Sequence, residues 1–195
     1  MRAGQILRCF LSRDTETLVR AFVTYVRPLL EYCTPIWSPS SVSMIKRVES
    51  VQRVFTKKLP IMKYLTYKER LSVLSLESFE LRRLKADLVM CFKILKGFTN
   101  INPSQFFTWS SRTSRGNSMK LYYPDSRVTA RQHFYSVRVV QLWNKLPEEV
   151  VSASTVSAFI SRLKSMHTSF LTLCFNAVFS VLFFYLSFWA VVGAF

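Results

Sequence analysis

Lysine and arginine recur at helical spacing in three stretches of this sequence, a pattern suited to contacting phosphates. A step of three, four or seven residues returns to nearly the same face of an α-helix, so each stretch predicts a basic stripe. The three sets are Lys46, Arg53 and Lys57; Arg82, Lys85, Lys93 and Lys96; and Arg131, Arg138 and Lys145. A stripe of this kind attracts polyanions, but it is also typical of an ordinary solvated helix face.

The overall composition favours the polyanion interpretation. The 195 residues include 27 Lys and Arg against 11 Asp and Glu, a formal net charge of +16, and every charged residue lies at or before Lys164. Half of the residues are hydrophobic and 15% are aromatic, which argues against disorder. The polybasic part is therefore expected to fold and to attract nucleic acid or acidic membrane lipid. No secretory signal is recognisable at the start, and the four scattered cysteines indicate free thiols in a reducing compartment.

Helices separated by proline and serine are expected to position these stripes. The strongest helix signal runs from Leu76 to Phe98, where Ser78 is a candidate N-cap and Gly97 a candidate left-handed C-cap. Other expected N-caps are Asp14, Ser40 or Ser41, Thr66 in a capping box with Glu69, and Ser154 or Thr155. Pro28 is expected to break the helix that begins at Asp14, at a point near Arg27. The sequence thus predicts a mainly α, bundle-like fold over residues 1–167.

The middle of the chain shows no sustained period. Residues 100–118 combine Pro103 with serines and threonines and with Arg112 and Arg115, which predicts a basic loop. Residues 120–123 are expected to form at most a short strand. From Thr129 the pattern turns helical again, with Tyr135, Val139, Leu142, Trp143 and Leu146 on one side.

Four segments taken together resemble one known family. They are RPLLEYCTPIWSP, VESVQRVFTKKLP, LTYKERLSVLSLESFELRRLKADLVMCFKILKG and RVTARQHFYSVRVVQLWNKLPEEVV. Their order is similar to that in the region after the polymerase palm of non-long-terminal-repeat retrotransposons of the jockey type, and the resemblance covers roughly Ile6 to Lys164. It implies a helical thumb and connector that grips an RNA template and the growing DNA.

The resemblance and the stripes together suggest which residues contact nucleic acid. By the resemblance, Trp143, Leu146 and Pro147 of WNKLP hold the fold, whereas basic residues bind the backbone. The expected nucleic-acid-binding residues are Arg53, Lys57, Lys58, Arg82, Arg83, Lys85, Arg112, Arg115, Arg131 and Arg138.

Catalysis is not expected from this chain. Polymerases need paired carboxylates that hold two divalent metals, and the resemblance implies an aromatic-x-Asp-Asp turn in a full-length relative. Here Asp14, Asp87 and Asp125 are isolated, and His133 and His167 lack a plausible metal partner. No glycine-rich phosphate loop or zinc knuckle is present in the sequence. We therefore expect no cofactor, no metal, no small-molecule substrate and no polymerase activity from this chain alone.

The last 28 residues, 168–195, form an uncharged hydrophobic tail that departs from the family. About 20 apolar residues suffice to cross a bilayer, so Phe170 to about Ala190 is a candidate transmembrane helix. Arg162 and Lys164 predict that the basic part faces the cytosol.

Three interpretations of the chain remain open at this point. The first is a palm-less reverse transcriptase fragment that binds nucleic-acid backbone without sequence preference, with a nuclear or cytoplasmic location. The second is a single-pass, tail-anchored membrane protein whose polybasic domain lies on anionic lipid. The third is a non-functional element remnant whose tail arose from a disrupted reading frame.

Overall fold

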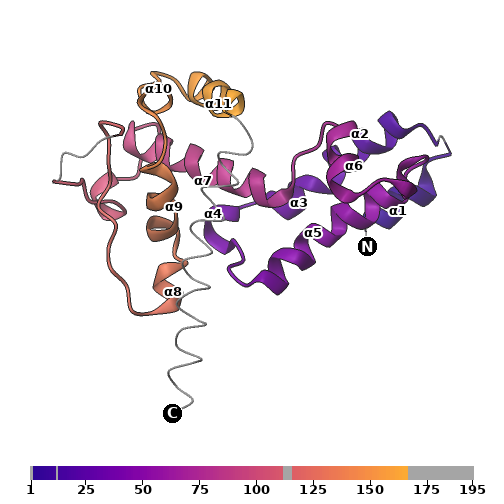
Figure 1. Ribbon diagram of the computed structural model, residues 1–195, viewed down its shortest axis with the longest axis horizontal. Helices are drawn as coiled ribbons and strands as arrows, with labels where there is room; N and C mark the ends of the chain where they lie inside the picture. Colours follow the sequence, from indigo (N-terminus) through magenta and orange to yellow (C-terminus); the bar gives the residue numbers. More distant parts are fainter. Residues whose placement is uncertain (1, 12, 112–115, 167–195) are drawn as a thin grey trace, which may run out of the picture. The chain divides into compact units, whose positions relative to one another are not determined.

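The computed structural model describes residues 2–11, 13–111 and 116–166, and it consists mainly of helices (Figure 1), which confirms the predicted mainly α fold. The α-helices are α1 (Arg2–Cys9), α2 (Thr15–Tyr25), α3 (Arg27–Glu31), α4 (Thr34–Trp37), α5 (Val42–Lys57), α6 (Tyr67–Val73), α7 (Phe79–Leu95), α8 (Thr129–Gln132), α9 (Tyr135–Trp143), α10 (Glu148–Val151) and α11 (Val156–Ser165). Two 3-10 helices, η1 (Met62–Tyr64) and η2 (Pro103–Gln105), complete the set.

The predicted transmembrane segment, Phe170 to Ala190, lies outside the described residues, as do Arg112 and Arg115. Among the helices that the structure does describe, none combines the length and the apolar character needed to cross a bilayer.

Two compact units make up the chain, Met1–Leu84 and Lys85–Phe195. The boundary falls within α7, so the first turns of this helix belong to unit 1 and the remainder to unit 2. The basic region predicted over residues 1–167 extends through both.

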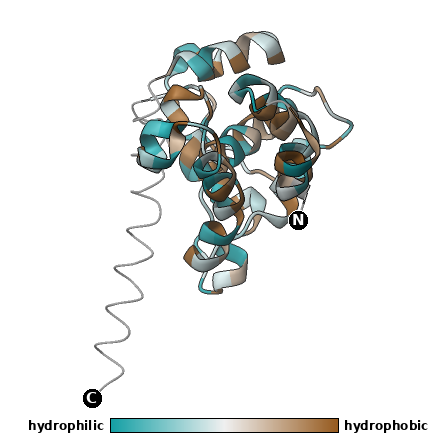
Figure 2. Cartoon of the chain, turned by 90° about the vertical axis from the view of Figure 1, so that its right-hand side faces the viewer, coloured by the Kyte–Doolittle hydropathy of each residue, from teal (hydrophilic) through white to brown (hydrophobic). Residues whose placement is uncertain are grey.

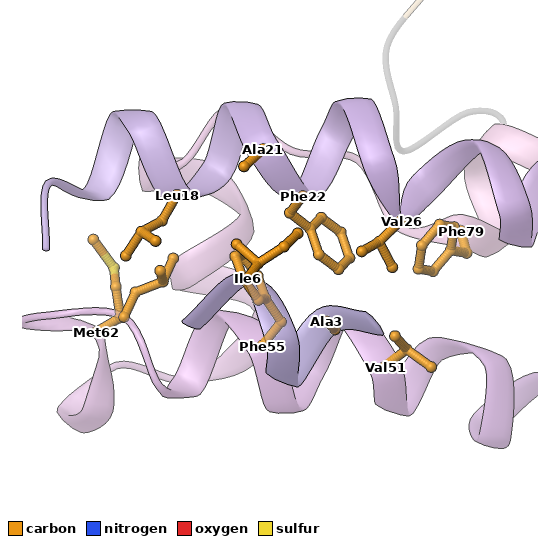
Figure 3. Close-up of a cluster of buried hydrophobic side chains, with 11 residues drawn as sticks. Ala3, Ile6, Leu18, Ala21, Phe22, Val26, Val51, Phe55, Met62 and Phe79 are labelled. Carbon is orange, nitrogen blue, oxygen red and sulfur yellow. The ribbon is translucent and has the colours of Figure 1, made fainter. Parts of the chain in front are cut away.

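Unit 1 is built on a hydrophobic core between α2 and α5, with α1 against both (Figure 3). Phe22 and Phe55 stack at its centre with their ring centroids 4.3 Å apart. The helices alternate hydrophobic and hydrophilic stretches along their length, as Figure 2 shows. The amphipathic patterns seen in the sequence therefore correspond to helices that bury one side.

Most helix ends follow the predicted caps. The Asp14 carboxylate accepts a hydrogen bond of 2.8 Å from Thr17 N, and Thr155 Oγ1 accepts one of 3.1 Å from Ala158 N. Ser41 rather than Ser40 begins α5, and Thr66 with Glu69 forms a complete capping box. The predicted break at Pro28 is also present, because α2 ends at Tyr25 and α3 starts at Arg27.

Helix α7 has both predicted ends. Ser78 Oγ accepts a hydrogen bond of 3.2 Å from Leu81 N at the start. At the other end Gly97 has φ +73°, and Gly97 N and Phe98 N donate to the carbonyl oxygens of Ile94 and Lys93. This pair of bonds is a Schellman motif, and its left-handed residue is the reason that glycine stands at this position.

Unit 2 buries a cluster of aromatic rings from α7, α9 and α11. Phe92 and Phe159 stack with centroids 4.3 Å apart, and Trp143 stacks on Phe159 at 6.1 Å. The indole Nε1 of Trp143 donates a 2.8 Å hydrogen bond to Met119 O. Trp143 and Leu146 are thus buried as the resemblance implied, whereas Pro147 is exposed and precedes α10.

The predicted helix from Thr129 through Leu146 is interrupted, which corrects the third basic stripe. Helix α8 ends at Gln132, and Phe134 adopts an extended conformation before α9 begins. Aromatic residues are poor helix formers in such a run, and the break lets Tyr135 point into the core while Phe134 stays exposed. Arg131, Arg138 and Lys145 consequently do not share one helix.

The short strand expected at residues 120–123 is reduced to a single bridge between Trp109 and Leu121. Ser110 N donates to Lys120 O at 3.0 Å and Tyr122 N donates to Thr108 O at 2.7 Å. The Asn144 side chain occupies the other edge of this segment, because it both accepts from Leu121 N at 2.9 Å and donates to Leu121 O at 2.7 Å. A side chain therefore makes the hydrogen bonds that a neighbouring strand would make.

Candidate nucleic-acid interface

The basic stripe on α5 forms as predicted. Lys46, Arg53 and Lys57 are all exposed, on the side of the helix opposite the buried Val51 and Phe55. A rise of 1.5 Å per residue places Lys46 about 10 Å from Arg53, and Arg53 about 6 Å from Lys57, along the helix axis. Three cations in line along a straight helix are well arranged to contact successive phosphates.

Residues 41–68, defined here as the basic segment, have an unusual distribution of charge. All seven of their basic residues are exposed: Lys46, Arg47, Arg53, Lys57, Lys58, Lys63 and Lys68. The only acidic residue within the segment is Glu49, which is 8% exposed. The surface of the segment is therefore predominantly positive, and the nearest exposed acid in the sequence is Glu69, which follows the segment directly and completes the capping box of α6.

Glu49 is buried because it serves the start of α7. Its Oε2 accepts a 3.0 Å hydrogen bond from Phe79 N, the first residue of that helix. Negative charge is favourable at a helix N-terminus, where the peptide dipoles leave partial positive charge. The Tyr67 hydroxyl donates a second hydrogen bond to Glu49 Oε1. Burial, as the larger cause, and the hydrogen bond to Glu49 both raise the pKa of Tyr67, so the phenol keeps its proton and remains a donor.

Arg53 is held in place by the same group of residues. Its guanidinium lies over the Tyr67 ring, 4.5 Å from the centroid. Gln52 Nε2 donates to the Tyr67 hydroxyl at 3.2 Å and to Glu77 O at 3.0 Å. These bonds hold the Tyr67 ring in place. A cation–π contact leaves the edge of the guanidinium free to donate hydrogen bonds. Arg53 is thus positioned by a buried network while it remains exposed itself.

Two of the predicted phosphate ligands instead form ion pairs within their units. The first is Arg82 in unit 1, which binds the Glu31 carboxylate with two nitrogens, one of them 2.8 Å from Oε2. Glu77 lies 3.9 Å from the same guanidinium. The hydrogen bond to Glu31 raises the pKa of Arg82 above its already high value, so the guanidinium stays charged in this ion pair.

The second is Arg138 in unit 2, which binds Asp87. Arg138 Nε lies 3.0 Å from Asp87 Oδ2, and Arg138 Nη2 lies 3.2 Å from Asp87 Oδ1. Arg138 Nη1 also donates to His133 O at 3.0 Å, a carbonyl that the break between α8 and α9 leaves without a helical partner. Asp87 is buried, so this pair holds α9 against α7 within the unit.

The remaining predicted site residues differ in how far they are exposed to solvent. Lys57, Lys58 and Arg131 are exposed, Lys85 is half-buried and Arg83 is buried. The structure therefore brings Arg53, Lys57 and Lys58 together on the basic segment of unit 1, whereas Arg131 belongs to unit 2.

The predicted site residues omitted Lys46 and Arg47 on α5, and they also omitted three exposed residues that follow Pro60. These three are Lys63, Lys68 and Tyr64, and the Tyr64 side chain is 88% exposed. The periodicity argument missed them because they follow Pro60 and do not lie on a continuous helix. The local excess of basic over acidic residues would have identified Lys63 and Lys68.

The three aspartates lie in three different surroundings. Asp14 caps α2, Asp87 pairs with Arg138, and Asp125 is exposed. In the part of the chain that the structure describes, no three histidine, cysteine or acidic side chains gather in a way that could hold a metal ion.

Comparisons with known proteins add no relative to this description: no family model, no curated protein and no solved structure matches the chain.

Proposed function

We propose that the chain is a nucleic-acid-binding module that grips the phosphate backbone without reading base sequence, and that unit 1 carries the principal surface through α5 and the turn after it. The module acts as a thumb or connector of a non-long-terminal-repeat retrotransposon reverse transcriptase. Its ligands are duplex DNA, an RNA–DNA hybrid or single strands of either kind.

One observation carries this proposal: basic and acidic side chains of the basic segment are sorted, with the cations outside and the single carboxylate inside. A solvated helix face of the ordinary kind mixes both signs, which limits its field. A predominantly positive surface attracts a polyanion at long range and releases counterions on contact. The ordered resemblance of the four sequence segments to the retrotransposon thumb region supports the same class of ligand.

The test is the salt dependence of binding. We compare the full chain with a variant that carries Lys46→Ala, Arg53→Gln and Lys57→Ala, using duplex DNA and RNA–DNA hybrid and fluorescence anisotropy between low and moderate salt. Each phosphate contact contributes about 0.9 to the slope of log affinity against log salt on B-DNA. Loss of the stripe is therefore expected to flatten the slope by roughly two to three and to weaken binding to every sequence equally.

A charge-matched control removes Arg8, Arg127 and Lys164, which are exposed residues outside the basic segment and outside the predicted stripes. We expect this control to keep most of the affinity and slope of the unmodified chain. Equal losses in both variants would show that net charge alone drives binding, and an unchanged slope in the stripe variant would refute the proposed surface. Loss on one base sequence only would indicate base readout instead.

A second prediction concerns activity. Purified protein with primer, template, nucleotides and magnesium is expected to extend no primer, because the sequence contains no pair of aspartates to hold two metals. The measurement is extension of a labelled primer on a gel, with a known reverse transcriptase as the positive control. Extension that persists through repurification to constant specific activity would contradict this prediction.

A further inference from the structure

The turn after α5 presents two large apolar side chains to solvent in the middle of the basic segment. Ile61 is 85% exposed and Tyr64 is 88% exposed, whereas Leu59 and Met62 on either side of Ile61 are buried in the core of unit 1. Four lysines surround them in the sequence: Lys57, Lys58, Lys63 and Lys68, all exposed. Exposed aromatic rings within basic surroundings are the usual elements of a single-strand binding surface.

The backbone of this turn is held rigidly. Ile61 adopts φ +67°, a left-handed conformation that β-branched residues rarely occupy, so it persists only because the surroundings impose it. The turn closes through Met62 N to Leu59 O and Leu65 N to Met62 O, both at 3.3 Å. Its side chains are therefore presented on a preorganised support.

Arg70 joins this turn to the last turns of α5. Its buried guanidinium donates to Leu65 O at 2.7 Å, to Thr56 Oγ1 at 3.2 Å and to Arg53 O at 3.5 Å. Because one guanidinium contacts all three, residue 65 lies beside the part of α5 that carries Arg53 and Lys57. Tyr64 is consequently placed next to the end of the basic stripe.

We infer that Tyr64 is a stacking platform for an unpaired base, and that the basic segment takes a single strand whose phosphates lie along the stripe. This inference rests on the proposed function, since it specifies the ligand of the same surface. A base in a duplex is already stacked on both faces and is not accessible to the ring, whereas every unpaired base has a free face. Ile61 offers an apolar contact beside the stacked base. The lysines account for the anionic charge of the strand.

The test compares a fluorescein-labelled 20-nucleotide oligothymidine with a duplex of equal length. Tyr64→Ala is expected to weaken single-strand binding roughly 5- to 150-fold, which corresponds to the loss of one base–aromatic stack. Duplex affinity and the salt slope are expected to stay unchanged, because stacking releases no counterions. Tyr64→Phe keeps the ring and is expected to bind like the unmodified chain. Tyr32→Ala, at a side chain 77% exposed in the same unit, is the matched control and is expected to have no effect.

A direct readout uses 2-aminopurine within the oligonucleotide, whose fluorescence falls when the base stacks on an aromatic ring. Quenching is expected with the unmodified chain and with Tyr64→Phe, and recovery is expected with Tyr64→Ala. Unchanged single-strand affinity in Tyr64→Ala would overturn the inference while leaving the proposed function intact, and so would equal losses in Tyr64→Ala and Tyr64→Phe.

Failure of the proposed function has a different signature, because the stripe variant would then bind both ligands as well as the unmodified chain does. Vesicles of phosphatidylserine and phosphatidylcholine form the last arm. Release of Tyr64→Ala from these vesicles, with no change in single-strand affinity, would assign the turn to a lipid surface and overturn the inference.

Discussion

Replacing Arg138 by alanine is expected to lower the free energy of unfolding by about 3 kcal/mol, because the change removes a two-nitrogen ion pair from the buried Asp87 carboxylate. The Asp87 side chain is 4% exposed, so water cannot replace the lost guanidinium. His133 O loses a donor as well. Urea denaturation followed by far-ultraviolet circular dichroism measures the effect.

Arg131→Ala is the matched control for this change. Arg131 is exposed at the end of α8, only seven residues earlier, and its loss is expected to change stability by less than about 0.5 kcal/mol. Arg138→Lys is expected to lower the free energy of unfolding by more than Arg131→Ala does and by up to as much as Arg138→Ala does. The reason is that an ammonium cannot bind both carboxylate oxygens and the His133 carbonyl in one plane. A double-mutant cycle with Asp87→Ala then isolates the pair. Additive losses would show that the ion pair contributes nothing beyond its separate residues.

The outcome also distinguishes the predicted phosphate contact of Arg138 from its structural ion pair with Asp87. If Arg138 contacted phosphate, its removal would weaken nucleic-acid binding at temperatures where the protein remains folded. We expect instead that any loss of binding follows the loss of folded protein.

Trp143→Ala is expected to destabilise unit 2 by about 3–5 kcal/mol, the typical cost of removing a large aromatic side chain from a well-packed core. Trp143 is fully buried, stacks on Phe159 and donates to Met119 O. Its removal creates a cavity and leaves that carbonyl without its donor. The same urea denaturation measures the loss.

Two variants distinguish the contributions of volume and hydrogen bonding. Trp143→Phe keeps most of the ring but loses the Nε1 donor, so it is expected to cost less than Trp143→Ala and more than zero. Trp109→Ala is the control, because Trp109 is half exposed and its removal is expected to have little effect. Equal stability of Trp143→Ala and the unmodified chain would contradict the central place of Trp143 in the core.

Local structure was largely predictable from the sequence. Asp14, Thr66 with Glu69, and Thr155 cap the helices that they were expected to cap, and Gly97 ends α7 in a left-handed conformation. These features depend on residues three or four positions apart, so the information needed to predict them lies within one turn of helix. The stripe on α5 was predicted for the same reason, since Lys46, Arg53 and Lys57 lie on one uninterrupted helix.

What only the tertiary structure decided is which charged residues stay free for a ligand. Arg82 and Arg138 occupy stripes in the sequence, yet each binds a carboxylate 51 residues away. Glu49 looks like an ordinary surface acid, but it caps a helix that begins 30 residues later. Helical spacing specifies which residues share a face, whereas the packing of distant segments determines whether that face meets solvent or an opposite charge. The positive surface of α5 therefore arises from two causes: the spacing of its cations is written in the sequence, and the removal of its carboxylate from the surface follows from the fold.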